Sequence, residues 1–282
     1  MSDGTPNGPS GRSDRGPTGL ARALTFHASF DHGPDADYAA GDARIYTPAE
    51  GAAHGDGALV AGLGDPPLDL VPGGGRYGAA LEFSPERSHV VVYKAAENVA
   101  YSPSGFRGTI SFWMSLDPAA LPGRYCDPLQ VTDKRYNDAC LWLDFTKNDA
   151  PPDLRLGVFG DLRAWNASGR ESGSEEFYWR LLKVAVPPFA AGRWTHVAIT
   201  WDGVNTAAGG RASLYLDGEY RGATGRIAEP FTWDIANARI RLGTGRFVGR
   251  LDDLAAFDRP LTAAEIRDLH RLDGGVAALR RP

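Results

Sequence analysis

The sequence predicts an all-β protein, an antiparallel sandwich of two sheets with one short C-terminal helix. Short runs of alternating apolar residues recur along the chain. In the run 193–203, Val197, Ile199 and Trp201 fall on one side of an expected strand. Asp-Gly pairs at 202–203 and 217–218 follow two of these runs and favour tight hairpin turns, because glycine accepts positive φ at little cost. Strands and turns at this spacing indicate a β-sandwich.

Length and composition suit one such domain. All-β sandwiches of about this length, 282 residues, are often single domains. We expect a disordered tail over residues 1–20, rich in Gly, Pro, Ser and Asp, and one domain over 21–282. The net charge of -5 gives no indication of nucleic acid or an anionic membrane surface as a partner. The oligomeric state is not predicted.

The compartment is also not predicted. No apolar run is long enough to span a bilayer, and residues 1–19 lack the apolar region of a signal peptide. The two cysteines, Cys126 and Cys140, are equally compatible with a disulfide and with two free thiols, and no C-x-x-C motif is present.

The remaining elements follow from the same patterns. Strands are expected at 24–31, from 81 onward, and at 89–95, 109–116, 138–147, 153–160, 193–201, 212–216 and 238–244. The polar segment 117–137 is expected to be a loop. Residues 161–191 are an insertion relative to a minimal sandwich, and their aromatic residues favour a segment that lies over one face of a sheet. Thr262 and Glu265 form a capping-box pattern, which predicts the short helix.

Several motifs resemble one known family. The patterns W-x-H-V-A-I-T-W-D-G from 194, L-Y-L-D-G from 214 and G-x-L-D-D-L-A-x-F-x-R-x-L-T-x-x-E-I from 249 resemble laminin-G-like, concanavalin A-like lectin/glucanase domains. The resemblance covers about residues 24–272 and implies a jelly roll. It implies the fold more strongly than the activity, since this superfamily includes lectins, adhesion modules, glycoside hydrolases and polysaccharide lyases.

The leading functional hypothesis is a lectin-like glycan-binding groove. Alternation places several polar and aromatic side chains on the non-core side of their strands, and the resemblance implies that these strands are neighbours lining a concave groove. Tryptophan rings stack on sugars, while carboxylates and imidazoles bond the hydroxyls. The expected glycan-binding residues are Trp113, Trp142, Asp144, His196, Tyr125, Trp165 and Trp179. In the alternative interpretation, the insertion covers the tryptophans and forms a second small core.

Two other function classes remain open. One is a carbohydrate-active enzyme, a polysaccharide lyase or a glycoside hydrolase, with His196, His27 and Asp144 as catalytic candidates. The E-x-D-x-x-E carboxylate pattern of laminarinase-like hydrolases is absent, so no catalytic residue is assigned and binding is the preferred function. The other class is a protein-interaction domain resembling laminin G modules.

The resemblance also implies a structural calcium ion between the first and last strands. The matching residues are Asp31, after the first strand, and Asp252 or Asp253 near the end of the domain. Calcium takes several oxygen ligands, including backbone carbonyls that a sequence does not reveal. The alternative is that hydrogen bonds alone satisfy Asp252 and Asp253.

Overall fold

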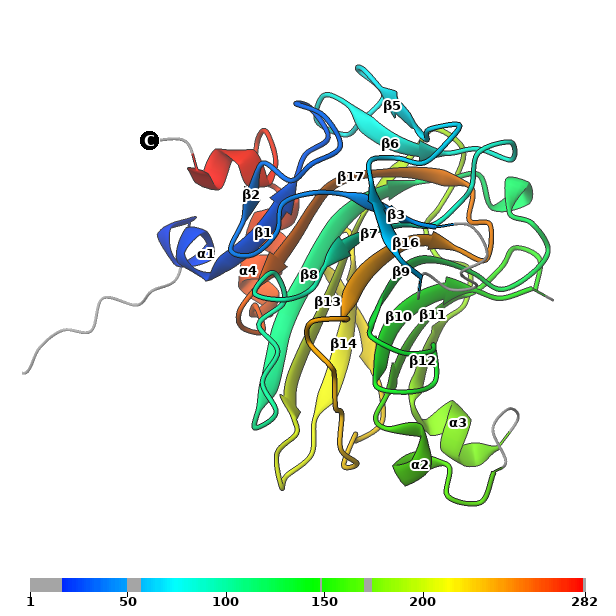
Figure 1. Ribbon diagram of the computed structural model, residues 1–282, viewed down its shortest axis with the longest axis vertical. Coiled ribbons are helices and arrows are strands. Elements are labelled where there is room, and N and C mark those ends of the chain that lie inside the picture. The colour runs from blue at the N-terminus through cyan, green and yellow to red at the C-terminus, as the bar shows by residue number, and fades with distance from the viewer. Residues whose placement is uncertain (1–16, 50–56, 148, 170–173, 281–282) are drawn as a thin grey trace, which may run out of the picture.

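The structure, a computed structural model, describes residues 17–49, 57–147, 149–169 and 174–280. Two antiparallel sheets pack against each other as a sandwich (Figure 1), which confirms the predicted fold class. Sheet A runs, from edge to edge, through β15 (Glu219–Ala223), β14 (Arg211–Leu216), β13 (Trp194–Val204), β8 (Phe106–Ser115), β17 (Gly249–Phe257), β1 (Leu24–Ala28) and β2 (Tyr38–Ala39), with β6 (Ala80–Phe83) pairing with β17 and β5 (Asp69–Val71) with β6. Sheet B runs through β12 (Leu181–Val184), β11 (Leu154–Phe159), β10 (Cys140–Phe145), β9 (Cys126–Thr132), β16 (Arg239–Thr244), β7 (Val91–Lys94), β3 (Tyr46–Pro48) and β4 (Leu59–Ala61).

The main core lies between the sheets, where the apolar sides of the alternating runs meet. In sheet A, Val197 on β13 lies opposite Phe112 on β8. In sheet B, Leu143 on β10 lies opposite Leu129 on β9. All four side chains are buried in one cluster. Full burial of such a side chain stabilises the fold by about 1.5–3 kcal/mol, so alternation decides which face of each strand turns inward. The outer faces are left to helices, loops or a ligand.

The outer face of sheet A is covered by the two ends of the described chain. The predicted helix is α4 (Ala263–His270), where Thr262 and Glu265 form both hydrogen bonds of the capping box. An unpredicted helix, α1 (Pro17–Ala23), lies near it, next to β1 (Figure 1). Together with sheet A these segments form a second cluster, made of Leu20, Ala23, Leu24, Ala198, Tyr215, Ala255, Phe257, Leu261, Ile266, Leu269 and Val276.

The expected tail over residues 1–20 is too long at its C-terminal end. Residues 1–16 lie outside the described residues, but residues 17–20 belong to α1. Leu20 is 1% exposed in the cluster under α4. A seven-residue helix offers little local signal, and its burial depends on contacts with the far end of the chain.

The segment 117–137, expected to be a loop, contains a central strand of sheet B. After the short η1 (Pro118–Ala120), the chain enters β9, which pairs with β10 on one side and β16 on the other. Pro128 and the charged Asp127 interrupt the apolar alternation, and the register shifts against β10 between Leu143 and Phe145. These features hide the strand from a pattern-based analysis.

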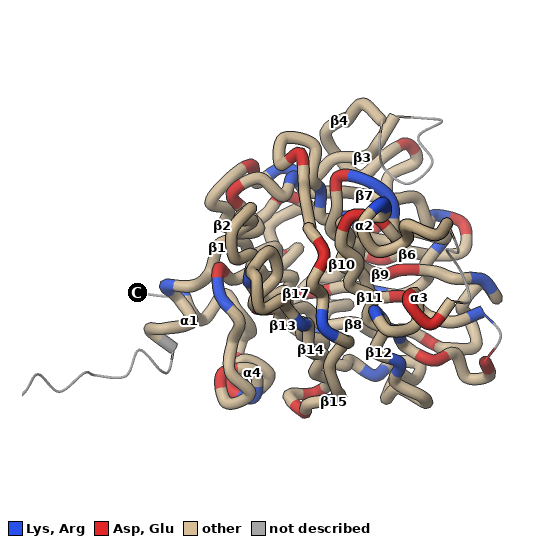
Figure 2. The backbone as a smooth tube through the Cα atoms, turned by 90° about the horizontal axis from the view of Figure 1, so that it is seen from below, with Lys and Arg blue, Asp and Glu red and all other residues tan. Residues whose placement is uncertain are grey.

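The insertion over residues 161–191 adds structure to sheet B. It contains α2 (Leu162–Trp165), α3 (Glu175–Trp179) and the edge strand β12. Both helices lie beside β10 and β11, on the opposite side of the molecule from α1 and α4 (Figures 1 and 2). The expectation that this segment covers one face of a sheet therefore agrees with the structure. The last described element is η2 (Val276–Arg280).

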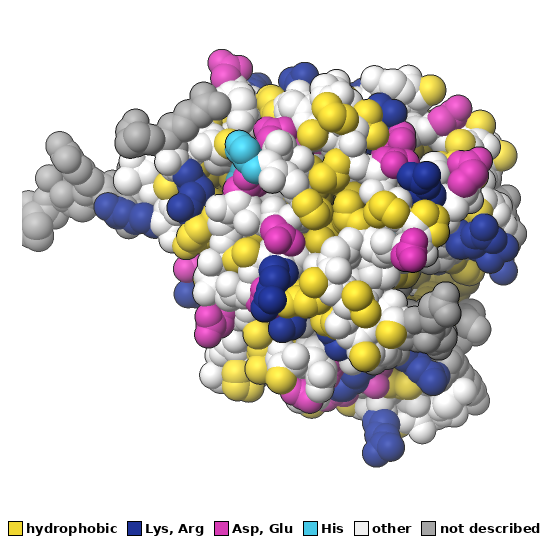
Figure 3. All heavy atoms as spheres, turned by 45° about the horizontal axis from the view of Figure 1, so that its top comes forward, with side chains coloured by type: hydrophobic (Ala, Val, Ile, Leu, Met, Phe, Trp, Pro, Cys, Tyr) yellow, Lys and Arg dark blue, Asp and Glu magenta, His cyan; other side chains and the backbone are white. Residues whose placement is uncertain are grey.

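The surface and the cysteines add few constraints. Acidic and basic side chains are interspersed over the face in Figure 3. Among the described residues, no helix has the length and apolar character needed to cross a membrane. Cys126 and Cys140 are both buried and both free, and burial raises the pKa of the Cys140 thiol well above its usual range.

Candidate functional site

Of the seven side chains expected to line one groove, the four on expected strands lie on two different sheets. Trp113 and His196 are direct partners across β8 and β13 of sheet A. Trp142 and Asp144 lie on β10 of sheet B. Alternation turns each of them outward correctly, but outward from opposite sides of the sandwich. The prediction of a single groove is therefore wrong, because alternation gives the face of a strand and not the sheet to which it belongs.

Trp113 and His196, on the outer face of sheet A, are covered by other parts of the chain. Trp113 is 3% exposed and packs against the rings of Tyr77, His196 and His270, with their centroids 5.9, 5.2 and 5.5 Å away. His196 Nε2 lies 2.8 Å from the hydroxyl of Ser111. Burial, followed by the nearby His270, lowers the pKa of His196 to about 3. The imidazole is therefore neutral and enclosed, and this geometry gives it no substrate to act on.

His27, a catalytic candidate from the sequence, links two parts of sheet A. It is 1% exposed, and its Nε2 lies 2.7 Å from Oδ1 of Asp253. Asp253 also accepts a hydrogen bond from the amide of Val276 at 3.0 Å. His27 and Asp253 thus join β1, β17 and the start of η2 in the interior.

The outer face of sheet B carries a pocket of about 310 Å³. Its floor consists of outward side chains from four neighbouring strands, and α3 and the segment before β9 supply its walls. It is lined by Tyr125, Asp127, Gln130, Tyr136, Trp142, Asp144, Arg155, Phe177, Tyr178, Thr244 and Gly245. Of the expected glycan-binding residues, Tyr125, Trp142 and Asp144 meet here. The volume lies at the lower end of the usual range for ligand pockets, about 300–1,000 Å³.

Trp142 is held firmly at one side of this pocket. Its Nε1 donates a hydrogen bond to the carbonyl of Tyr136 at 2.7 Å, and its ring stacks on Phe159 with the centroids 5.9 Å apart. On the neighbouring strand, Gly157 leaves room for the indole: a Cβ there would lie 2.3 Å from the ring. Only 1% of Trp142 is exposed, so it shapes the pocket more than it offers open surface.

Trp165 and Trp179 do not line the pocket. Trp165, in α2 of the insertion, is buried with Phe177 and Trp142, and its Nε1 donates to the carbonyl of Asn137 at 2.8 Å. Trp179 is 58% exposed, and its Nε1 lies 3.3 Å from the carbonyl of Arg226. The insertion therefore does form a second small core, as the alternative interpretation has it, and the pocket opens beside that core.

Sequence reasoning expected Asp144 at the site but missed Asp127, Gln130 and Arg155 on the pocket floor. Arg155 donates to both carboxylate oxygens of Asp144, with Nε 2.8 Å from Oδ1. Gln130 donates a hydrogen bond to Asp127. Burial, followed by the charge of Asp144, raises the pKa of Asp127 to about 7. One carboxylate is therefore matched by a guanidinium, while its neighbour keeps its proton to near neutral pH.

A signal for Arg155 was present in the sequence. It occupies an outward position of an expected strand and lies directly opposite Asp144 in the β10–β11 hairpin. Opposite charges on facing positions of consecutive strands indicate a cross-strand pair. Asp127 and Gln130 gave no such signal, because β9 was not recognised as a strand.

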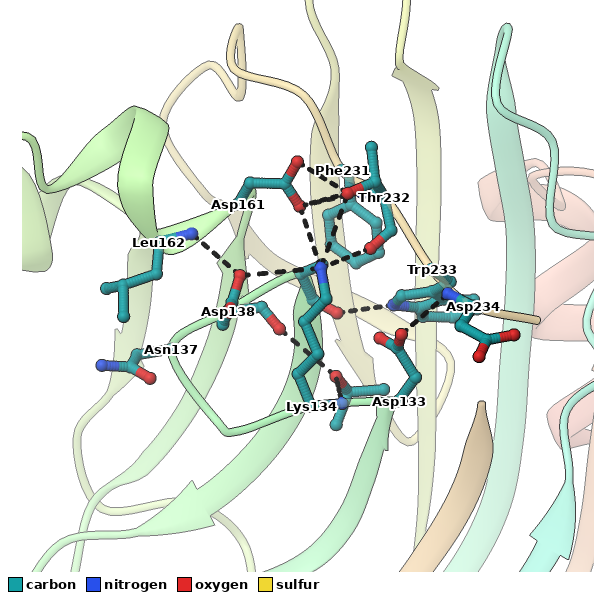
Figure 4. A network of polar contacts seen from close by, with 12 residues as sticks. Asp133, Lys134, Asn137, Asp138, Asp161, Leu162, Phe231, Thr232, Trp233 and Asp234 are labelled. Carbon is teal, nitrogen blue, oxygen red and sulfur yellow. Dashed lines mark hydrogen bonds and ion pairs between the residues drawn. The ribbon is translucent and has the colours of Figure 1, made fainter. Parts of the chain in front are cut away.

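A polar network fixes the insertion beside the pocket (Figure 4). Nζ of Lys134, just after β9, donates to the carbonyl of Thr232 at 2.7 Å and lies 3.4 Å from Oδ1 of Asp161. Asp161 also accepts from the hydroxyl of Thr232. Asp138 accepts from the amide of Leu162 at 2.9 Å, at the start of α2. The start of the insertion is thus tied to both the β9–β10 connection and the segment before β16.

A family model described as the concanavalin A-like lectin/glucanases superfamily matches residues 93–267. The chain belongs to this superfamily. The match includes all of the pocket-lining residues. No protein with a curated description matches the chain.

Three solved structures are similar to this superfamily member, and the first of them shares its fold. Domain 4 of AbnA, a GH43 extracellular arabinanase from Geobacillus stearothermophilus in complex with arabinotriose, is 16% identical with a TM-score of 0.52, covering 87% of this chain and 97% of that one. The binding domain of Paraclostridial Mosquitocidal Protein 1 is 14% identical with a TM-score of 0.46, over 89% of this chain and 52% of that one. Trypanosoma rangeli sialidase in complex with the inhibitor DANA is 16% identical with a TM-score of 0.46, over 71% of this chain and 29% of that one.

Two of the three residues expected at the calcium site, Asp31 and Asp252, are linked in the structure through a shared loop. Asp31 and Asp252 both contact one short loop, since they accept hydrogen bonds from the amides of Ala79 and Tyr77 at 2.6 and 2.8 Å. Oδ1 of Asp252 is buried and has no hydrogen-bond partner among the described residues. Within the same residues, no group of three or more His, Cys, Asp and Glu side chains could hold a metal.

The donor set therefore fits calcium only with additional backbone or water oxygens. The loop comes very close to both carboxylates because it lacks side chains there: a Cβ on Gly78 would lie 2.0 Å from Oδ1 of Asp31, and one on Gly75 would lie 2.7 Å from Oδ2 of Asp252. Asp253, the third expected ligand, is instead hydrogen-bonded to His27 and to the amide of Val276.

Proposed function

We propose that this protein binds a glycan in the pocket on the outer face of sheet B. The observation that carries the proposal is the convergence of aromatic and hydrogen-bonding side chains from four adjacent strands in one hollow. Tyr125 and Tyr178 are 45% and 59% exposed at its mouth, while Trp142 shapes its interior. Asp144 and Gln130 offer polar atoms at the floor. Rings of this kind stack on the apolar faces of sugars, and carboxylates and amides bond hydroxyls.

The superfamily and its solved structures support this proposal. The family description itself names lectins and glucanases. The arabinanase domain with the same fold was solved in complex with arabinotriose. Since that domain is only 16% identical, the likeness supports a glycan as the ligand class and gives no particular sugar.

Tyr125→Ala is the test variant. Tyr125 is exposed at the mouth of the pocket, so its removal should weaken glycan binding at least about ten-fold, equivalent to about 1.4 kcal/mol, with little change in melting temperature. Tyr220→Ala is the matched control, because Tyr220 is 55% exposed and lies outside the pocket. Binding is measured by affinity gel electrophoresis and calorimetry against a panel of neutral and acidic polysaccharides.

The outcomes separate the hypotheses. Retardation that is lost in Tyr125→Ala and kept in Tyr220→Ala supports the glycan-binding pocket. Equal binding by both variants would place the glycan elsewhere on the molecule. No binding by the unaltered protein across the panel would oppose the proposal and favour a protein-interaction domain.

A second candidate function is carbohydrate cleavage in the same pocket. It is favoured by Asp127, because burial and the nearby charge of Asp144 raise the pKa of its carboxyl group to about 7. General acid catalysis on a glycosidic bond uses a carboxylic acid that keeps its proton near neutral pH, together with a second carboxyl group. New oligosaccharides seen by mass spectrometry, and lost in Asp127→Asn, would establish this function, with unsaturated ends indicating a lyase. A panel without new products would leave binding alone.

We also propose a structural calcium ion between Asp31 and Asp252. The support is the buried, unpartnered Oδ1 of Asp252 and the closeness of both carboxylates to the loop around residues 75–79. A divalent cation there would join the end of β1, the loop before β6 and the middle of β17. Its chemistry would be structural, since the pocket of sheet B lies on the other sheet.

A further inference from the structure

A second hollow, of about 380 Å³, adjoins the pocket on sheet B. It is lined by Tyr125, Thr146, Lys147, Asp149, Arg155, Tyr178, Leu181 and Lys183. Three of these residues, Tyr125, Arg155 and Tyr178, also line the first pocket. The two hollows therefore share one wall, and a ligand longer than a single sugar would extend from one into the other. We call the first the inner pocket and the second the outer hollow.

The two hollows differ in charge. The inner pocket presents two acidic side chains and one basic side chain, which is Arg155. The outer hollow presents three basic side chains, Lys147, Arg155 and Lys183, against one acidic side chain, Asp149. Asp144 and Asp153 offset the charges of Arg155 and Lys183, so Lys147 is the lining cation of the outer hollow without an ion pair among the described residues. A cation of this kind beside a ligand pocket favours an anionic ligand group.

The cations of the outer hollow keep unused bonding capacity. Lys147 makes no ion pair with any residue that the structure describes, and its Nζ lies 5.1 Å from the centre of the Tyr125 ring. Arg155 uses Nε and Nη2 on Asp144, so Nη1 has no hydrogen-bond partner within the described chain. Nζ of Lys183 lies 2.6 Å from Oδ2 of Asp153, so this ion pair already uses its charge.

Tyr125 brings the two available cations together. The guanidinium carbon of Arg155 lies 4.7 Å from the centre of its ring, and Nζ of Lys147 lies 5.1 Å from it. Two cations on one ring repel each other, and an anion between them would relieve that repulsion. Arginine and lysine donors bond carboxylate and sulfate oxygens with charge-assisted hydrogen bonds, which are stronger than neutral ones.

We propose that the glycan of the inner pocket is acidic, and that Lys147 and Arg155 bind a carboxylate or sulfate on the adjacent sugar in the outer hollow. This inference rests on the proposed glycan-binding function and narrows its ligand class. A uronic acid and a sulfated sugar share the anionic chemistry, so the experiment must distinguish these two sources.

The experiment compares matched ligands on the full chain. The first pair is galacturonic acid oligosaccharides and the same oligosaccharides with their carboxyls reduced to alcohols. The second pair is chondroitin sulfate oligosaccharides and their desulfated forms. Affinities are measured by calorimetry at about 50 mM and 500 mM salt, because electrostatic binding weakens as salt shortens the screening length to well under 10 Å.

Substitutions at Lys147 isolate the charge. Lys147→Met keeps most of the apolar stem against Tyr125 and removes the ammonium, and Lys147→Arg keeps the charge. We expect Lys147→Met to weaken binding of the acidic member of a pair about three- to ten-fold, with the neutral member unchanged and Lys147→Arg close to the unaltered protein. Arg107→Met is the control, since Arg107 is exposed on β8 of the other sheet and its loss changes the net charge equally.

Failure of this inference is distinct from failure of the proposed function. If neutral and acidic members bind equally well, and Lys147→Met changes neither, the inner pocket still binds glycans and the acidic assignment is overturned. If no member of either pair or of the wider panel binds, the glycan-binding function itself fails. A preference for the acidic member that Arg107→Met reduces as much as Lys147→Met would reflect overall charge and would also overturn the assignment.

Discussion

The protonated carboxyl on the floor of the inner pocket makes the stability of this protein depend on pH. Asp127 is buried beside Asp144, and burial raises its pKa in the folded protein to about 7 from the ordinary aspartic acid value of 3.8. The folded state therefore holds this proton over a pH range in which the unfolded state has already released it. Stability from this group is highest below pH 4 and falls as the pH rises to about 7.

The magnitude follows from the shift. Raising the pKa from 3.8 to about 7 corresponds to roughly 4 kcal/mol between the two limits, since each tenfold change in proton affinity is about 1.4 kcal/mol. Between pH 5 and pH 8 the part lost is roughly 2–3 kcal/mol, or about 5–10 °C in melting temperature for a domain of this size. In Asp127→Asn this group no longer titrates, and the amide oxygen can still accept from Gln130. We expect the variant to gain roughly 2–3 kcal/mol on the unaltered protein between pH 5 and pH 8.

Urea unfolding followed by tryptophan fluorescence at pH 5, 6, 7 and 8 measures this difference. Other titrating groups are common to both proteins and cancel in the comparison. Asp258→Asn is the control, because Asp258 is exposed beyond β17 and outside the pocket. If the free energies of unfolding of Asp127→Asn and the unaltered protein differ by the same amount at every pH, Asp127 is ionised in the folded state and the reasoning is refuted.

Three further predictions concern the inner pocket and the proposed calcium site. Arg155→Met should destabilise the protein by about 3–5 kcal/mol in urea unfolding, because it leaves Asp144 buried without its cation. The double variant with Asp144→Asn should recover most of this loss, and a single variant as stable as the double one would contradict the prediction. Gly157→Ala should lower stability by about 1–3 kcal/mol, because its Cβ would meet the Trp142 ring, and an unchanged unfolding midpoint would show that the indole moves freely. Chelation of calcium should lower the melting temperature of the unaltered protein and have no effect on Asp252→Asn; an unaltered protein that melts identically with and without chelator would oppose the calcium proposal.

Much of the fold could be predicted because its signals are local. The run containing Val197 and Ile199 and the Asp-Gly turns act within a few residues, so β13 and β14 were expected where they lie. The capping box of Thr262 and Glu265 is equally local, and α4 begins there. The helix α1 was missed because its burial depends on contacts with residues about 240 positions away, which no local pattern contains.

The site was only half predictable for a similar reason. Alternation turned Trp113 and Trp142 outward correctly, but the two faces differ in what covers them. Trp113 lies under the loop of Tyr77 and the helix of His270, and both come from distant parts of the chain. The pocket depends on Asp127 in β9, whose pattern is interrupted by a proline. Long-range coverage and an irregular strand are the two features that sequence periodicity cannot resolve.

The insertion that borders the inner pocket has an apolar cluster of its own, separated from the main core by the full thickness of sheet B. Trp165 and Phe177 contact the outer side of the sheet, and polar bonds between Lys134, Thr232 and Asp161 hold the start of the segment in place. The residues that the insertion contributes to the inner pocket, Phe177 and Tyr178, can therefore change with little demand on the residues that drive folding. In evolution, exchange of α2 and α3 between relatives offers a route to new ligand preferences while the two sheets stay unchanged. The same exchange is a starting point for engineering the ligand preference.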